Sequence, residues 1–330
     1  MILIIDQRTV SVSYESQTLC IRRDHEPMQR IPLNLLEQMI VYGKPNIDIS
    51  VWRALSAAAI PACLLSLRGG QEPVVLASGL AKRLPLRRLQ YRCAENKNHA
   101  HAIARWFLAQ KFVSYDLSLN VLSEAQQNAF KQQRHTLTEN LNQSQNIQAM
   151  MGLEGALAHA WFASLAETLP AQWRFSGRNR RPPQDPFNAL LSLGYTLLTG
   201  EIRQILVSEG LDPAFGFLHQ PAPGREALAL DFTELFRSAV DFALYAFIEE
   251  LTPQDFYYSQ AHGCRLTKSA RPLFYRFWAE FREQCPRYAG NSQAEENGKI
   301  VSAPLPEQIR GRVAVLRECM KSLEAEPSDD

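Results

Sequence analysis

The sequence contains no apolar run that approaches the ~20 residues needed to span a bilayer as a helix. Residues 1–5 are apolar, but Asp6 interrupts them well before the length of a signal-peptide core. Internal repeats and low-complexity segments are also missing. These absences argue against a membrane protein and lead us to expect a cytoplasmic one.

Cysteine is sparse and irregularly spaced. No Cys-x-x-Cys pair is present, whereas disulfide frameworks and zinc modules need closer or more regular spacing. His262 and Cys264 are near neighbours, which we interpret as an ordinary packing or surface pair. We expect free thiols in a reducing compartment at all six positions, which are Cys20, Cys63, Cys93, Cys264, Cys285 and Cys319.

The chain also lacks an excess of charge, since 35 basic and 34 acidic side chains leave a net charge of +1. A surface for DNA must then come from local clustering rather than from the total charge. Basic residues gather in segments 82–92 and 174–181. One such cluster alone is usually a solvated face, but two of them in a chain with metal-type side chains favour a DNA partner.

The length of 330 residues allows two domains, and the pattern along the chain changes near residue 81. Strand-type segments occur at 2–5, 10–14, 63–67 and 74–76, and short helical spacings at 33–40 and 51–59. These indicate a small β-rich N-terminal domain over residues 1–81. The charged segment 82–92, with a proline, is predicted to be a linker.

Helical periodicity dominates the rest of the chain. Helices are predicted at 100–112, 122–141, 146–169, 186–209, 228–251, 270–285 and 306–326, with a mobile loop at 286–299. The predicted fold class is therefore α+β. A small β-rich N-terminal domain precedes a larger all-α C-terminal catalytic domain over residues 93–330.

Glu154, His219, Asp231 and Glu234 are the side chains best suited to chemistry. Carboxylates joined by one histidine suit Mg²⁺ or Mn²⁺, and such a metal commonly serves phosphodiester chemistry. Asp231 and Glu234 are three residues apart, so they share one face of a helix. An exposed, salt-bridged face is the plain alternative. The apolar surroundings instead predict a largely buried helix, on which Glu234 faces a site and Arg237 pairs with Asp241.

Glu154 stands alone among apolar residues, between Gly152 and Gly155. Glycine weakens a helix, so its presence on both sides suggests the close approach of a ligand or of another backbone. Close helix packing alone would explain the glycines equally well.

Four segments in order resemble the Cas1 family, the CRISPR-associated endonucleases and integrases that insert new spacers. They are MGLEG at 151–155, GRNRRPPQDPFNALLSLGY at 177–195, GLDPAFGFLH at 210–219 and LDFTELFR at 230–237. The resemblance implies that Glu154, His219 and Glu234 are metal ligands for Mg²⁺ or Mn²⁺. It implies that Asp231 is a nearby acid important for activity. Many relatives carry Asp where Glu234 stands. The longer side chain of Glu changes the reach of the carboxylate more than its chemistry as a metal ligand.

The resemblance also implies DNA contacts by side chains around and beyond the arginine- and proline-rich segment. These are Arg178, Arg180, Arg181, Asn188 and Tyr195. Apart from the resemblance, Arg225, Lys268 and Arg271 are further candidates for DNA contact. Asn188 and Tyr195 could equally be hydrogen-bonding residues of the core.

The implied activity is metal-dependent insertion of short foreign DNA into a CRISPR array, by attack of a DNA 3′-hydroxyl on a phosphodiester. The implied partners are double-stranded and branched DNA and a Cas2 protein. The β-rich domain would form a homodimer, and two dimers would assemble with one Cas2 dimer. A non-catalytic homologue that only binds DNA is one alternative, and an unrelated helical metallohydrolase with a small substrate is another.

Overall fold

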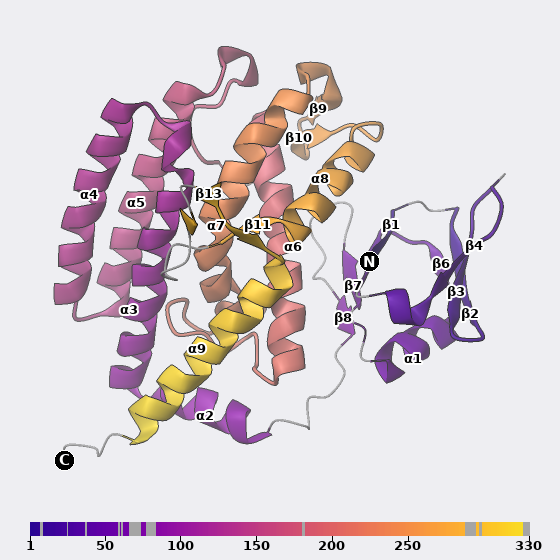
Figure 1. Cartoon of the computed structure of the whole chain (residues 1–330), viewed down its shortest axis with the longest axis horizontal. Coiled ribbons are helices and arrows are strands. Elements are labelled where there is room, and N and C mark those ends of the chain that lie inside the picture. Colours follow the sequence, from indigo (N-terminus) through magenta and orange to yellow (C-terminus); the bar gives the residue numbers. More distant parts are fainter. Residues whose placement is uncertain are drawn as a thin grey trace. The chain divides into compact units, whose positions relative to one another are not determined.

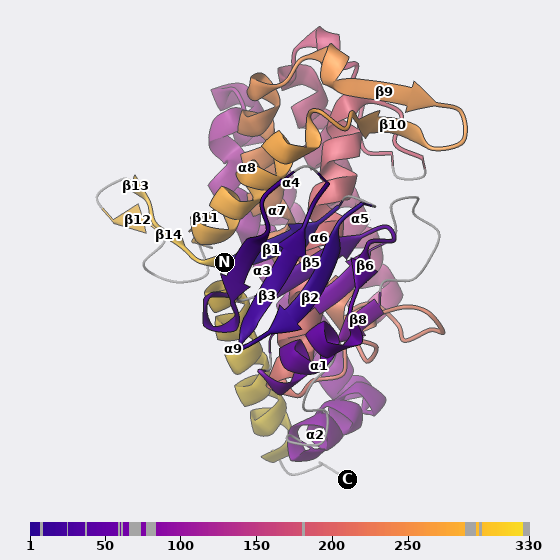
Figure 2. The same ribbon diagram turned by 90° about the vertical axis from the view of Figure 1, so that its right-hand side faces the viewer.

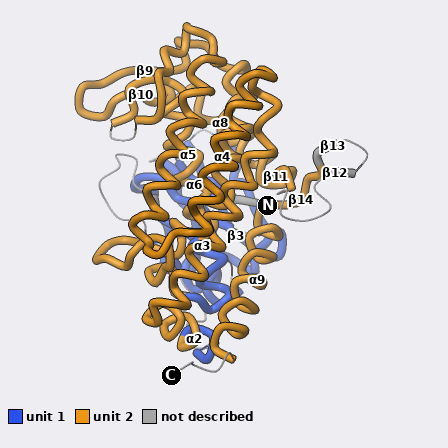
Figure 3. Tube along the Cα trace, turned by 90° about the vertical axis from the view of Figure 1, so that its left-hand side faces the viewer, with its two compact units in different colours: residues 1–87, 203–211 blue, residues 88–202, 212–330 orange. Residues whose placement is uncertain are grey.

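The computed structural model divides the chain into two compact units (Figures 1 and 3). Unit 1 comprises residues 1–87 and 203–211, and unit 2 comprises residues 88–202 and 212–330. The structure describes residues 1–6, 9–24, 26–36, 38–58, 60, 62–65, 74–76, 84–179, 182–287, 295–296 and 299–325.

Two four-stranded sheets form the framework of unit 1, and their strands are visible in Figure 2. The first sheet has the order β1 (Ile2–Ile5), β5 (Gln38–Tyr42), β7 (Ala62–Leu65) and β8 (Val74–Leu76). The second has the order β4 (Gln29–Pro32), β3 (Thr18–Arg22), β2 (Ser11–Glu15) and β6 (Asn46–Ile47). Apolar side chains from both sheets share one core, which includes Leu3, Leu19 and Val41.

Helix α1 (Ile49–Ala57) contributes Val51 and Leu55 to the same core. It begins where the Asp48 side chain accepts a hydrogen bond from the Ser50 N–H, which satisfies one of the open donors of the first turn. The predicted helix at 51–59 and the four predicted strands are thereby confirmed.

The predicted helix at 33–40 is wrong. This segment holds a short 3₁₀ turn (Leu33–Leu35) followed by strand β5. All five residues of β5 are buried, because Met39 and Val41 face the apolar core and Gln38, on the other face, is covered by Gln204. A strand covered on both faces loses the alternation that identifies half-buried strands, so its apolar residues simulate helical spacing.

Unit 2 is mainly helical, and its helices follow the predicted order. Their bounds are α2 (Leu84–Glu95, which begins within unit 1), α3 (Lys97–Ser114), α4 (Glu124–Gln143), α5 (Ile147–Thr168), α6 (Pro186–Glu209), α7 (Ala227–Phe247), α8 (Arg271–Glu283) and α9 (Leu305–Ala325). Helix α7 is apolar around most of its circumference and buries most of its side chains. It packs against α3, which also contacts α4, α5 and α9 (Figure 1).

The α+β fold class is confirmed, with three refinements. The helical part also contains short strand pairs, such as the hairpin of β9 (Phe256–Ser259) and β10 (Gly263–Leu266). Most of the predicted linker lies in α2. Residues 203–211, which include the end of α6, group with unit 1, where the Gln38 side chain donates a hydrogen bond to Gln204 (2.6 Å).

The loop predicted at 286–299 lies mostly outside the described residues. Described there are Pro286 of the short strand β11 (Cys285–Pro286), which pairs with β14 (Ser302–Ala303), and Arg287. The strand β12 (Glu295–Glu296) pairs with β13 (Lys299–Ile300). Among the described helices, none is long and apolar enough to cross a membrane.

Candidate functional site

Glu154 and Glu234, two of the predicted ligands, converge on a single cation from this chain. Their carboxylates come from α5 and α7, and both form ion pairs with the Lys111 ammonium of α3. The Lys111 Nζ lies 2.5 Å from Oε2 of Glu234. The Lys111 side chain is only 2% exposed and that of Glu234 only 4%, while Glu154 is 16% exposed. The three helices therefore build a buried, charged centre that opens to solvent on the Glu154 side.

The electrostatics of this centre favour the charged forms. Burial alone would raise the pKa of Glu234, but Arg237 and Lys111 outweigh it and lower the pKa to about 2, with a smaller contribution from His219. Burial likewise opposes the charge of Lys111, yet the Glu234 and Glu154 carboxylates hold its pKa above the ordinary value. The Arg237 Nη2 lies 2.9 Å from the second oxygen of Glu234. The Glu234 carboxylate is thus ionised, as a metal ligand must be, and it lies between the Lys111 and Arg237 cations.

His219 is fixed by Asp231. The Asp231 carboxylate is fully buried, and it accepts backbone N–H bonds from Phe217 (2.7 Å), Leu218 (3.1 Å) and His219 (2.8 Å). Its Oδ1 also lies 2.7 Å from the His219 Nδ1. A carboxylate at Nδ1 keeps the proton there and leaves Nε2 as the ring atom that can bind a metal. Asp231 is accordingly a positioning residue in this structure.

Gly216 lets the loop before His219 lie against α7. A Cβ on Gly216 would come within 2.6 Å of the Ala227 backbone and 2.8 Å of an Asp231 oxygen. Only a residue without a side chain fits there, which explains the glycine of the GFLH segment.

The donor set fits a divalent cation that prefers oxygen. Two carboxylates already share one positive charge, and one imidazole nearby presents Nε2. In the described part of the chain, however, the ligand atoms of Glu154, His219 and Glu234 do not all lie within 4.8 Å of one another. Lys111 occupies the position between the carboxylates, so its ammonium must move aside for a metal to bridge them.

Asp241 belongs to a neighbouring network rather than to an ion pair with Arg237, which corrects the predicted pairing. Its carboxylate accepts hydrogen bonds from the Tyr195 hydroxyl and from the Trp161 Nε1 (3.0 Å). Burial raises the pKa of Asp241 to about 6, although these hydrogen bonds and then the Arg237 charge oppose the shift. The Arg237 guanidinium lies over the Tyr195 ring, 4.6 Å from its centroid, and pairs with Glu234.

Asn188 and Tyr195 are hydrogen-bonding core residues in this structure, which was the alternative to a DNA contact. Asn188 is fully buried, and its side-chain oxygen accepts hydrogen bonds from the Asn179 N–H (3.0 Å) and the Arg178 guanidinium (2.7 Å). Tyr195 is 7% exposed. In this structure the buried Asn188 side chain holds the arginine-rich loop, and a direct DNA contact by it stays a prediction.

The remaining predicted DNA contacts differ in accessibility. Arg178 is half-buried and bound within its loop, whereas Arg225 and Lys268 are exposed and Arg271 is half-buried. Arg180 and Arg181 lie outside the described residues. Direct DNA contact by all these side chains stays a prediction.

Gly152 and Gly155 lie on an open surface of α5. Both are exposed, and a Cβ on either would meet nothing within 4 Å apart from the helix itself. Close helix packing, the plain explanation for these glycines, is therefore wrong. The other explanation, the close approach of a ligand beside Glu154, remains.

Lys111 was missed in the sequence, although a signal was present. It stands one turn after Phe107 and next to Phe112, on the apolar face of a clear helical pattern. A lysine among core positions requires a partner of opposite charge, and this requirement alone could have directed attention to it.

Comparison with known proteins identifies the family of this chain. The family model of CRISPR associated protein Cas1 matches residues 3–280. The chain belongs to the Cas1 family. A curated relative, CRISPR-associated endonuclease Cas1 1 of Chlorobaculum tepidum, is 33% identical over 240 residues, which cover 69% of this chain and 70% of that protein. Membership confirms the predicted CRISPR-associated nuclease of spacer integration.

Solved structures show the same fold at lower identity. A casposase bound to integration product has a TM-score of 0.79 and 22% identity, and the match covers 98% of this chain and 92% of that one. A Cas6-RT-Cas1–Cas2 complex contains a chain with a TM-score of 0.78 and 23% identity, and the match covers 98% of this chain and 35% of that one.

Proposed function

We propose that this Cas1-family protein is a metal-dependent DNA integrase and endonuclease. It would join the 3′-hydroxyl of a short foreign DNA to a phosphodiester of a CRISPR array. One observation carries the proposal: Glu154 and Glu234, from two helices, converge on one cation beside a histidine that Asp231 orients.

Mg²⁺ or Mn²⁺ held by Glu154, Glu234 and the His219 Nε2 would supply Lewis-acid activation of the phosphate and of the attacking hydroxyl. The chain's own residues prepare this site. Arg237 keeps Glu234 ionised, and Asp231 keeps the Nδ1 of His219 protonated and the ring in place.

DNA would approach over α5 beside Glu154. The open surface at Gly152 and Gly155 lets a sugar–phosphate backbone come close to the helix. The exposed Arg225 guanidinium, six residues beyond His219, suits bidentate phosphate contact. These contacts orient the substrate but carry no sequence information.

The proposed partners are double-stranded and branched DNA, a Cas2 protein and a second copy of this chain. DNA and Cas2 are supported by the structures of related fold, one bound to integration product and one a Cas1–Cas2 complex. The homodimer is proposed through unit 1, as the family resemblance implies.

The test is strand transfer on branched DNA with Mg²⁺ or Mn²⁺, comparing the wild type with His219→Ala. We expect the rate to fall by roughly 100-fold or more, because one metal ligand is lost. His135→Ala serves as the control, since this histidine is 76% exposed on α4 and should retain full activity.

Equal activity in wild type and His219→Ala would overturn the assignment of the site. If both proteins bind the branched DNA but neither transfers strands, the chain is a non-catalytic DNA-binding homologue. Binding that does not weaken as salt rises would contradict phosphate recognition and favour a small-molecule substrate.

A further inference from the structure

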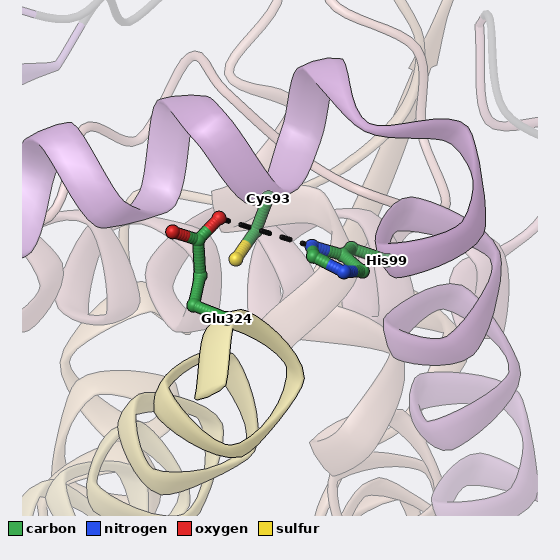
Figure 4. Close-up of side chains that lie close together, drawn as sticks. All are labelled: Cys93, His99 and Glu324. Atoms are coloured by element: carbon green, nitrogen blue, oxygen red, sulfur yellow. Dashed lines mark ion pairs between the residues drawn. The ribbon is translucent and has the colours of Figure 1, made fainter. Parts of the chain in front are cut away.

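A second cluster of metal-binding side chains lies in unit 2 at the C-terminal end of α9. Cys93 of α2, His99 of α3 and Glu324 of α9 each place one ligand atom within 4.8 Å of the other two (Figure 4). No other group of three or more His, Cys, Asp or Glu side chains in the described part of the chain meets this condition. The sequence separates these residues by up to 231 positions, so tertiary structure alone assembles them.

The three atoms differ in what already contacts them. The Cys93 thiol is fully buried and donates a long hydrogen bond (3.7 Å) to the Met320 carbonyl. The His99 Nδ1 is buried without a hydrogen-bond partner, since the nearest Glu324 oxygen is 3.9 Å away. The other Glu324 oxygen lies 2.9 Å from Arg92. This imidazole nitrogen faces a thiol and a carboxylate with only the 3.9 Å ion-pair contact to Glu324, so it lacks the hydrogen bond that its burial requires.

We propose that Cys93, His99 and Glu324 bind one Zn²⁺ ion. Sulfur, nitrogen and oxygen ligands together suit this borderline-soft metal, whereas Mg²⁺ avoids thiolate. In a tetrahedral zinc site the ligand atoms are about 3.5 Å apart, so atoms now within 4.8 Å need only a small inward movement.

Zinc binding would also replace the weak contacts that these groups now make. Burial and then the Glu324 charge raise the pKa of the Cys93 thiol to about 12, so the group is neutral without a metal. Zn²⁺ binds the thiolate and releases its proton, which replaces a long, weak sulfur contact by a metal bond. Bound zinc would fasten the last turn of α9 to the junction of α2 and α3. It would thus be a structural metal, separate from the proposed DNA chemistry.

The experiment is titration of the metal-free, full-length protein with Zn²⁺, followed by calorimetry, and with Co²⁺, followed by absorption. We expect one Zn²⁺ per chain and a thiolate-to-cobalt charge-transfer band. Cys93→Ser and His99→Gln should each weaken Zn²⁺ binding by at least about 100-fold and remove the band. Zinc should raise the unfolding temperature of the wild type by several degrees and leave that of both variants unchanged.

Cys285→Ser is the matched control. Cys285 is also fully buried, and its sulfur also makes one long contact to a backbone carbonyl, that of Pro286 at 3.8 Å. This variant should bind Zn²⁺ as the wild type does. If Cys93→Ser does not fold, His99→Gln and Glu324→Gln decide the matter, because both side chains are partly exposed.

Two outcomes would overturn the proposal. One is the absence of stoichiometric Zn²⁺ binding by the wild type. The other is Zn²⁺ binding that persists in Cys93→Ser but disappears in His219→Ala, which would place the ion in the DNA-processing centre. Retention of zinc by an inactive His219→Ala variant would show that the two sites are independent.

Discussion

At the scale of single residues, Lys111 determines the protonation state of the two carboxylates of the candidate site when no metal is bound. Two carboxylates facing each other across a buried space would repel strongly, and one would take up a proton. The Lys111 ammonium prevents this by pairing with both Glu154 and Glu234. The same ammonium would compete with the proposed divalent cation for these oxygens. The affinity for that metal would then be set by a balance between two cations, one of which the chain supplies.

Replacement of Lys111 by Met tests this balance. We expect Lys111→Met to bind Mn²⁺ roughly 10-fold more tightly or better, because the internal competitor is gone. The metal-free variant should lose about 3–5 kcal/mol of stability, the usual cost of breaking a buried ion pair. Mn²⁺ titration followed by electron paramagnetic resonance and urea unfolding would measure the two effects. Unchanged or weaker Mn²⁺ binding would show that Lys111 is not a competitor.

At the scale of elements, the first half of α5 has lower helix stability but an open surface beside Glu154. Two glycines in its first half cost helix stability, and no neighbouring element uses the space they leave. A DNA backbone beside Glu154, as proposed above, would use this space.

Gly152→Ala and Gly155→Ala separate stability from access. Each should stabilise the protein by about 0.5–1 kcal/mol, because both positions are helical and nothing obstructs a methyl group. Gly155→Trp should fold equally well and weaken binding of branched DNA, measured by fluorescence anisotropy. Gln133→Trp, on the exposed face of α4, is the control. If Gly155→Trp binds DNA as well as the control does, DNA does not pass over this part of α5.

At the scale of the whole molecule, the two units differ in what they bury. Among the described residues, buried carboxylates such as Asp231, Glu234 and Asp241 lie in unit 2, whereas unit 1 buries an apolar cluster and the cation of Arg203. Apolar burial does not depend on pH, but a buried ionised carboxylate loses its partners when it is protonated. Unit 2 should therefore be the acid-sensitive part.

The pKa of Glu234 gives the pH window. It is lowered from 4.5 to about 2 in the folded chain, so its contribution is fully present above about pH 4.5 and is lost as the pH falls towards 2. This contribution is on the order of 3 kcal/mol. Urea unfolding of the metal-free protein between pH 5 and 2 should show a flatter pH dependence for Glu234→Gln than for the wild type. Identical slopes would contradict the role of Glu234.

The sequence by itself determined most of the long helices and the family. Helical periodicity is a local property, so α6 was predicted with the bounds that the structure shows, and α5 within one residue at each end. The four contiguous motifs identified the family for the same reason, because each lies within a few turns of chain. The predicted site also rests on these motifs, which include Glu154, His219, Asp231 and Glu234.

Only the tertiary structure decided the features that depend on contacts between residues far apart in the sequence. Strand β5 was mistaken for part of a helix because the burial of both its faces removed its alternation. The hairpin of β2 and β3 turns at Ser16 and Gln17, both with positive φ, where the sequence offers no glycine or asparagine signal. Lys111 joined the site, and Cys93 joined His99 and Glu324, only because separate helices pack side by side. Periodicity shows which face of a helix is buried, but only packing selects the partner that face meets.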